Sequence, residues 1–173
     1  DAASGPRLWS TDGSEEETVP VFDPPLSSQQ IQLVGVIQPE SAEKPGGLLL
    51  VMESEPATRQ LFVYTQAMTE PQLLANLGGF TSMAPALDSG TVFNNVYYFP
   101  AYDAEHGGEL WRTDGTLAGT LQLGDIWSGA RDSLPAGFGA CGVRLCFSAD
   151  DGVHGRELWS TDGTWAGTSL VDD

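Results

Sequence analysis

The feature that most constrains this chain is an internal repeat. The segment E-L-W-S-T-D-G-T-W-A-G-T-S-L begins at Glu157, and a nearly identical segment, E-L-W-R-T-D-G-T-L-A-G-T-L-Q-L, begins at Glu109. A third copy, R-L-W-S-T-D-G-S, begins at Arg7, and a divergent fourth, Q-L-F-V-Y-T-Q-A, begins at Gln60. The copies are therefore spaced 53, 49 and 48 residues apart. Strand-like repeats near this period are typical of β-propeller blades.

The intervals between the copies predict four short strands in each full unit, named a, b, c and d in chain order. No segment keeps a 3.6-residue apolar period, so we expect almost no helix. The polar stretch 27–30 is expected to be a connection, and residues 39–47 a mobile loop. The three full units are expected to have strands at 31–37, 48–52, 61–65, 73–77, 86–93, 96–102, 109–113, 120–123, 136–141, 144–149, 157–161 and 168–171.

The first unit is incomplete, because only strands c and d, at 7–11 and 19–22, precede the second unit. The total is two strands plus three times four, or fourteen strands. We predict an all-β chain that forms one partial β-propeller domain. Since propellers close with roughly four to eight blades, these three and a half blades belong to a larger or oligomeric ring. The predicted domain covers residues 1–173, with repeat units 1–25, 26–78, 79–126 and 127–173.

Strand c carries adjacent leucine and tryptophan residues in three copies: Leu8-Trp9, Leu110-Trp111 and Leu158-Trp159. Adjacent side chains of a strand point to opposite faces, so each blade is expected to pack against both its neighbours. We predict that Trp111 and Trp159 are core residues whose indole N–H groups bond to an acceptor. A sugar-stacking role for the tryptophans is the alternative interpretation.

The turn between strands c and d reads T-D-G-T-x-A-G-T in the two best copies. Asp114 is expected to accept backbone N–H groups of its own turn, and Gly115 permits a positive φ. The turn is similar in mechanism to the Asp-box of sialidase propellers, although the spacing differs. The predicted structural repeat motif comprises Leu8, Trp9, Asp12, Glu109, Leu110, Trp111, Asp114, Gly115, Thr116, Glu157, Leu158, Trp159, Asp162, Gly163 and Thr164.

The two best copies resemble the bacterial ELWxxDGT repeat family, whose signature is E-L-W-x-x-D-G-T-x-x-G-T. Both satisfy every specified position, and the upstream Ala101, Asp103, His106 and Gly107 recur 48 residues later. The first copy departs from the signature at positions 7 and 14, and the second copy has lost its Trp, Asp and Gly. Clear resemblance covers about half of the chain. It implies a secreted or surface repeat protein of propeller type, and it implies no catalytic activity.

Cys141 and Cys146 are the only cysteines, and they flank the turn of a predicted hairpin. They are near enough to form a disulfide if the loop opens to four residues. A pair of small buried hydrophobic residues is the alternative, whereas a zinc site would need a second pair of cysteines.

The amino-acid composition of the chain restricts the kinds of molecule that it can bind. Seven basic residues stand against 24 acidic ones, for a formal net charge of -17. This charge excludes nucleic acid and anionic membranes as partners, because binding to phosphate depends on Lys and Arg. No apolar segment approaches the length of a membrane span. Glycine-rich, acidic composition favours a secreted or cell-surface protein, with Asp1 as a processed or engineered start.

The loops that join strands b to c and d to a are expected to share one face of the propeller. An acidic rim there offers weak calcium candidates at Asp103, Glu105, Asp150 and Asp151, although no D-x-D-x-D-G loop is present. A solvated rim without metal is the other interpretation, and no other cofactor is expected. His106 and His154 occupy matching repeat positions, which favours a turn-bonding role over catalysis.

The leading functional hypothesis is a non-catalytic extracellular module for recognition, adhesion or scaffolding, with a protein or glycan ligand. The alternative is a sialidase-like hydrolase or lyase, in which Arg131 or Arg156 would hold an acidic sugar. No nucleophile–base arrangement is evident, and the arginines are too scattered for that alternative.

The half unit at residues 7–22 predicts two open surfaces. Strand c there lacks the strand b that should pair with it, and strand d of the fourth unit is followed by no fifth blade. Either the remaining blades of a longer propeller or a second copy of the chain would complete the ring. Two copies would give 28 strands, or seven blades, but neither copy has spare a and b strands. We therefore favour a piece of a longer propeller.

Overall fold

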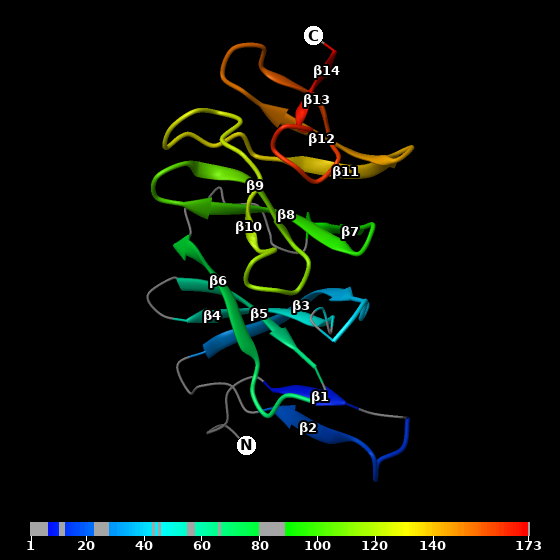
Figure 1. Cartoon of the computed structure of the whole chain (residues 1–173). Helices are drawn as coiled ribbons and strands as arrows, with labels where there is room; N and C mark the ends of the chain where they lie inside the picture. The colour runs from blue at the N-terminus through cyan, green and yellow to red at the C-terminus, as the bar shows by residue number, and fades with distance from the viewer. Residues whose placement is uncertain are drawn as a thin grey trace.

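Four antiparallel β-sheets, stacked in sequence order, make up the computed structural model of the chain (Figure 1). The structure describes residues 7–10, 13–22, 28–42, 44, 46–54, 58–65, 67–79 and 89–172. The first sheet has two strands, β1 (Leu8–Ser10) and β2 (Val19–Phe22). The second has β3 (Ser28–Ile37), β4 (Gly47–Ser54), β5 (Thr58–Tyr64) and β6 (Gln72–Gly79).

The third and fourth sheets repeat the order of the second. The third sheet contains β7 (Thr91–Phe93), β8 (Val96–Asp103), β9 (Gly107–Thr113) and β10 (Leu121–Gln122). The fourth contains β11 (Ala136–Cys141), β12 (Arg144–Asp150), β13 (Arg156–Thr161) and β14 (Ser169–Asp172). Each strand of these sheets pairs with the next one along the chain, as in an antiparallel meander.

The predicted all-β class, and the division into one two-stranded and three four-stranded sheets, are confirmed in the described residues. Several strand boundaries differ from those predicted. Strand β3 begins at Ser28, inside the stretch predicted to be a connection, because its polar residues continue the ladder to Ser54 of β4. Strand β10 is also shorter than expected. Thr11, Asp12 and residues 86–88 lie outside the described residues.

Tight hairpins join strands a and b in the third and fourth sheets. Asn94 and Asn95, between β7 and β8, have φ values of 49° and 60°, as a turn with two left-handed residues requires. Gly142 and Val143 make the corresponding turn between β11 and β12. Figure 1 shows these turns on one side of the stack and the β8–β9 and β12–β13 loops on the opposite side.

A disulfide joins Cys141 to Cys146 across the β11–β12 hairpin. The bridge is therefore confirmed, but the expectation that the loop must open to four residues was wrong. Cys141 pairs with Arg144 beside a two-residue turn, and Cys146 lies diagonally across the ladder with a Cα–Cα distance of 5.8 Å. This separation is within the ordinary range for a disulfide.

Two apolar clusters fill the spaces between the sheets. The first lies between the second and third sheets and includes Leu49, Val63 and Phe99. The second lies between the third and fourth sheets and includes Leu110, Phe147 and Trp159. Trp111, next to Leu110 in β9, packs against the first cluster, so this pair faces both neighbours as predicted.

The fourth sheet departs from this prediction on its outer face. Trp159 is buried against the third sheet, but Leu158 is 47% exposed on the other side. The indole nitrogens of Trp111 and Trp159 are buried, and neither has an acceptor in the described part of the chain. The expectation that both N–H groups would be bonded was therefore wrong. None of the described helical segments has the length and apolar character that a membrane span requires.

Candidate functional site

The turn between strands c and d is built by the same side-chain bonds in both copies. Asp114 Oδ1 accepts bonds from the backbone N–H of Thr116, at 3.1 Å, and from its hydroxyl, at 2.7 Å. The backbone N–H of Gly119 donates to Thr116 Oγ1, and Thr120 Oγ1 donates to the Thr116 carbonyl. Asp162, Thr164, Gly167 and Thr168 make the corresponding bonds in the fourth sheet. The predicted self-bonded turn is present twice.

The second glycine of the turn leaves room for the aspartate. A Cβ atom on Gly119 would lie 1.9 Å from Asp114 Oδ1, and one on Gly167 would lie 2.2 Å from Asp162 Oδ1. Real atoms cannot approach so closely, so a side chain here must displace the carboxylate from its bonds. The close approach of the aspartate therefore explains why the repeat signature has a glycine directly before its last threonine.

We expect Gly119→Ala to destabilise the protein by about 1–3 kcal/mol, because the methyl group forces the Asp114 carboxylate out of the turn. Gly139→Ala is the matched control, since nothing lies within 4 Å of the position its Cβ would take. That control should stay within about 0.5 kcal/mol of the parent. Urea unfolding measures both; equal effects of the two changes would contradict this account of the turn.

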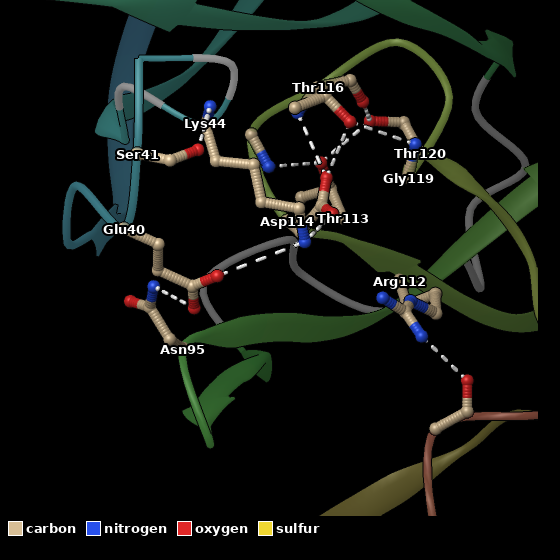
Figure 2. Close-up of polar contacts among 12 residues, drawn as sticks. Glu40, Ser41, Lys44, Asn95, Arg112, Thr113, Asp114, Thr116, Gly119 and Thr120 are labelled. Atoms are coloured by element: carbon tan, nitrogen blue, oxygen red, sulfur yellow. Dashed lines mark hydrogen bonds and ion pairs between the residues drawn. The ribbon is translucent and has the colours of Figure 1, made fainter.

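A cross-sheet cluster surrounds Asp114, and Figure 2 shows it. Lys44, from the loop between β3 and β4, places Nζ 2.9 Å from Asp114 Oδ2 and 3.8 Å from Glu40 Oε2. Asn95 Nδ2 donates to the Gln38 carbonyl at 2.9 Å and to Glu40 Oε1 at 2.8 Å. The loop that we expected to be mobile therefore ties the second sheet to two turns of the third.

Electrostatics at Asp114 follow from these contacts. Burial alone would raise the pKa of Asp114, but the bonds from Thr116 and the Lys44 ammonium outweigh burial and lower it. The pKa of Lys44 is raised by the same bond to Asp114. Asp162, in the equivalent turn, has its pKa lowered chiefly by Thr164. Both turn aspartates are thus held as carboxylates at neutral pH.

Glu109, the first residue of the repeat signature, is fully buried. Its carboxylate accepts the backbone N–H groups of Ile126, at 3.0 Å, and Trp127, at 3.2 Å, and the hydroxyl of Ser133, at 2.7 Å. These three donors belong to the segment that connects β10 to β11. Glu109 therefore anchors the connection between the third and fourth sheets. Burial raises the pKa of Glu109 to about 7, although the three hydrogen bonds oppose this shift.

The same connection is pinned by close backbone contacts. Asp132 Oδ1 accepts the backbone N–H of Gly108 at 2.7 Å, and the Leu134 N–H donates to the Gly108 carbonyl. A Cβ on Gly107 would lie 2.1 Å from the Arg131 carbonyl oxygen, and one on Gly152 would lie 2.4 Å from the Trp127 ring. The connection is therefore held between the two neighbouring b–c loops.

The predicted acidic rim consists mainly of turn-bonded carboxylates. Asp103 Oδ1 accepts the N–H groups of Glu105 and His106, and His106 Nδ1 lies 3.1 Å from the carboxylate. Asp151 and His154 repeat this arrangement at 2.6 Å. The matching His–Asp pairs agree with the predicted turn-bonding role of the histidines.

The rim aspartates differ in what sets their acidity. Burial would raise the pKa of Asp103, but hydrogen bonds from His106 and Glu105 outweigh it and lower the pKa. Bonds from His154 lower the pKa of Asp151 to about 2. The bond to Asp103 in turn raises the pKa of His106.

The structure does not bring the four calcium candidates together as a ligand set. Asp103 and Asp151 are engaged in their own loops, and Asp150 Oδ1 accepts the backbone N–H of Gly152. In the residues that the structure describes, no three His, Cys, Asp or Glu side chains gather where they could hold a metal ion.

The two arginines considered for sugar binding also have structural partners. Arg156 Nη1 donates to the Leu134 carbonyl and to Ser148 Oγ, both at 3.0 Å. The Arg131 guanidinium lies over the Trp127 ring, 5.8 Å from its centroid. The structure therefore places the two arginines in two different local contacts.

A pocket of about 540 Å³ opens at the ends of β3, β4 and β5. Its lining is mainly apolar and includes Val36, Leu48 and Tyr64. It lies away from the rim residues, and sequence reasoning missed it.

Sequence reasoning also missed the anchoring role of Glu109. The available signal was a carboxylate at the start of an apolar strand, repeated at Glu157. Comparison with protein-family models, with curated proteins and with solved structures finds no match to this chain.

Proposed function

We propose that this chain is a non-catalytic, β-propeller-type repeat module of a secreted or cell-surface bacterial protein, used for recognition, adhesion or scaffolding. The observation that carries the proposal is the use of the repeated polar side chains. Asp114 and Asp162 build their own turns, and Asp103 and Asp151 bond their own loops. The chemistry that recurs between units is thus structural.

The arrangement of the sheets supports a propeller-type assembly. Each complete sheet is a four-stranded antiparallel meander, and neighbouring sheets meet through their apolar faces. In the third and fourth sheets the a–b turns lie on one side of the stack and the b–c loops on the other (Figure 1). Such a stack presents loops of successive units side by side on a rigid frame, and loops of this kind serve as binding surfaces.

The b–c and d–a loops are the proposed ligand-facing surface. They carry carboxylates, two imidazoles and the Trp127–Arg131 pair on backbone that is fixed by hydrogen bonds. A protein or glycan ligand suits this mixture of polar and aromatic groups. The strongly acidic charge of the chain argues against nucleic acid.

A glycan array and a panel of chromogenic glycosides test this function on the 173-residue chain. We expect no turnover of any glycoside. The arginines that a sialidase-like site would need are bonded elsewhere, Arg156 to Leu134 and Ser148, and Arg131 over Trp127. Hydrolysis that a single carboxylate substitution abolishes would overturn the proposal in favour of a glycan-active enzyme.

The proposed partners within the assembly are the remaining blades of a longer propeller, and a second copy of the chain is the alternative. Leu110 is fully buried between the third and fourth sheets, whereas Leu158, at the same repeat position, is 47% exposed. Glu157 likewise lacks the full burial of Glu109. The outer face of the fourth sheet thus carries the repeat's contact residues without their neighbour.

A further inference from the structure

The face of the second sheet that is turned toward the first sheet is only half covered. The ladder places Leu33 opposite Leu50, and Val36 opposite Leu48, so these four side chains share one face. Leu50 is fully buried, whereas Leu33 is 52% and Val36 43% exposed. The most exposed of these side chains therefore lie on β3, the first strand of the sheet, while Leu73 of β6, on the same face, is 37% exposed.

The opposite face of the second sheet, which is turned toward the third sheet, is covered. Leu49 and Val63 are at most 1% exposed there. The covering element includes the β7–β8 hairpin: a methyl group on Gly35 of β3 would lie 3.3 Å from the Tyr97 ring and 3.4 Å from Val92. An a–b hairpin of the neighbouring sheet is thus what lies over β3 on the side that is covered.

Two further features lie on the half-covered side. The pocket of about 540 Å³ opens beside Val36, Leu48 and Tyr64. Strand β1 pairs with β2, and in the described part of the chain no strand pairs with its other edge. In each complete sheet the equivalent strand, β5, β9 or β13, pairs there with a strand b. The exposed apolar residues and the pocket are therefore on the side of the second sheet where the first sheet lies, with its open β1 edge (Figure 1).

We propose that this place is the seat of a two-stranded a–b hairpin from a further repeat unit of the same protein, outside these 173 residues. The second strand of the hairpin pairs antiparallel with β1, and its apolar face covers Leu33 and Val36. Main-chain bonds to the edge and alternate side chains in apolar pockets are how added strands bind a sheet. The inference rests on the proposed repeat function and names the partner that this surface takes.

The repeat also predicts which side chains the hairpin presents. In the third sheet the face turned toward the following sheet carries Tyr98 and Pro100, both buried. Residues at these two positions of the incoming hairpin would contact Leu33 and Val36. Large apolar residues are therefore expected at both.

A second copy of this chain is the less suitable donor. Its a–b hairpins are already paired with their own c strands, through seven residue pairs between β4 and β5 and seven between β8 and β9. Lending a hairpin would break one of these ladders in order to form a shorter one with β1. A hairpin from a unit that has no strand c of its own would bind β1 without breaking such a ladder.

The test fuses a second copy of the chain's own β7–β8 hairpin to the start of β1, so that it can occupy the hairpin seat. Residues 89–108 are placed directly before residue 7, so that the β7–β8 hairpin precedes β1 as it precedes β9 in the third unit. Leu33→Lys is then made in the parent chain and in the graft. We expect the substitution to change the parent's unfolding midpoint by less than about 1 °C and to lower that of the graft by about 4 °C or more.

Leu158→Lys is the matched control, because Leu158 is 47% exposed and lies on the fourth sheet, outside the grafted residues. It should act equally in both backgrounds. A Leu33→Lys effect that is equal in parent and graft would overturn the hairpin seat.

A second measurement needs no fusion. A peptide of residues 89–103, closed by an added terminal disulfide, should slow amide hydrogen exchange at Leu8–Ser10 of the parent at least tenfold, and should not do so in Leu33→Lys. Unchanged exchange would overturn the proposal. The two proposals fail separately, since glycoside turnover would overturn the non-catalytic function, whereas these outcomes concern the hairpin seat alone.

Discussion

Trp159→Ala should lower the free energy of unfolding by about 3–5 kcal/mol, as expected for a large aromatic side chain lost from a core. Trp159 is 9% exposed and packs in the cluster between the third and fourth sheets. Its direct neighbour across the ladder is Phe147, which is fully buried. Two sheets would face the resulting cavity, and neither can collapse into it without moving its partner strands.

The buried indole N–H of Trp159 acts in the opposite direction on the free energy of unfolding. The indole nitrogen of Trp159 is buried without an acceptor, so its removal relieves a cost of about 1–3 kcal/mol in the folded state. The net effect is therefore expected toward the lower end of the range. Apolar burial still dominates, because the ring fills the contact between two sheets.

Trp9→Ala supplies the matched control for this prediction. Trp9 occupies the same repeat position in β1 but is 53% exposed. Its replacement should cost less than about 1 kcal/mol, since little apolar area leaves the core. Urea unfolding followed by tryptophan fluorescence and circular dichroism measures both changes. Equal destabilisation by the two substitutions would contradict the burial difference between them.

The order of the strands was predictable from the sequence because the repeat gives each one a counterpart 48 to 53 residues away. Strong local signals support it, such as the two asparagines whose positive φ values make the β7–β8 turn. The extension of β3 to Ser28 was not predictable, because polar residues there carry no apolar alternation. Their place in the sheet depends on the partner strand β4.

The candidate site was less predictable because the sequence copies are alike while their surroundings are not. Glu109 and Glu157 carry the same local signature, but only Glu109 is fully buried beneath a connecting segment. The contacts of Lys44 with Asp114, and of Asn95 with Gln38, join residues more than 50 positions apart. A repeat shows which residues build a unit, but it does not show which units have neighbours.

The protein should lose stability as the pH rises through the range set by Glu109. The ordinary pKa of this group is 4.5, and burial raises the folded-state pKa to about 7. Between these values the folded state binds more protons than the unfolded state, so the free energy of unfolding falls with rising pH. The contribution is complete below about pH 4.5 and is lost as the pH rises through about 7. A shift of this size corresponds to at most about 3 kcal/mol.

Glu109→Gln isolates this contribution from other titrating groups. The pKa of His106 is raised from its ordinary value of 6.5 by the bond to Asp103, so its contribution has the same sign but is lost only as the pH rises above that value. The lowered pKa values of Asp103, Asp114, Asp151 and Asp162 affect stability only at more acidic pH. Subtracting the curve of Glu109→Gln from that of the parent therefore leaves the effect of Glu109.

Urea unfolding at pH 5, 6, 7 and 8 supplies the two curves. The parent should lose stability across this series by more than the Glu109→Gln variant does. If Glu109→Gln retains the full slope, the Glu109 carboxyl does not titrate in this range. The hydrogen bonds from Ile126, Trp127 and Ser133 would then outweigh its burial, and the connection between the third and fourth sheets would be held by an ionised carboxylate.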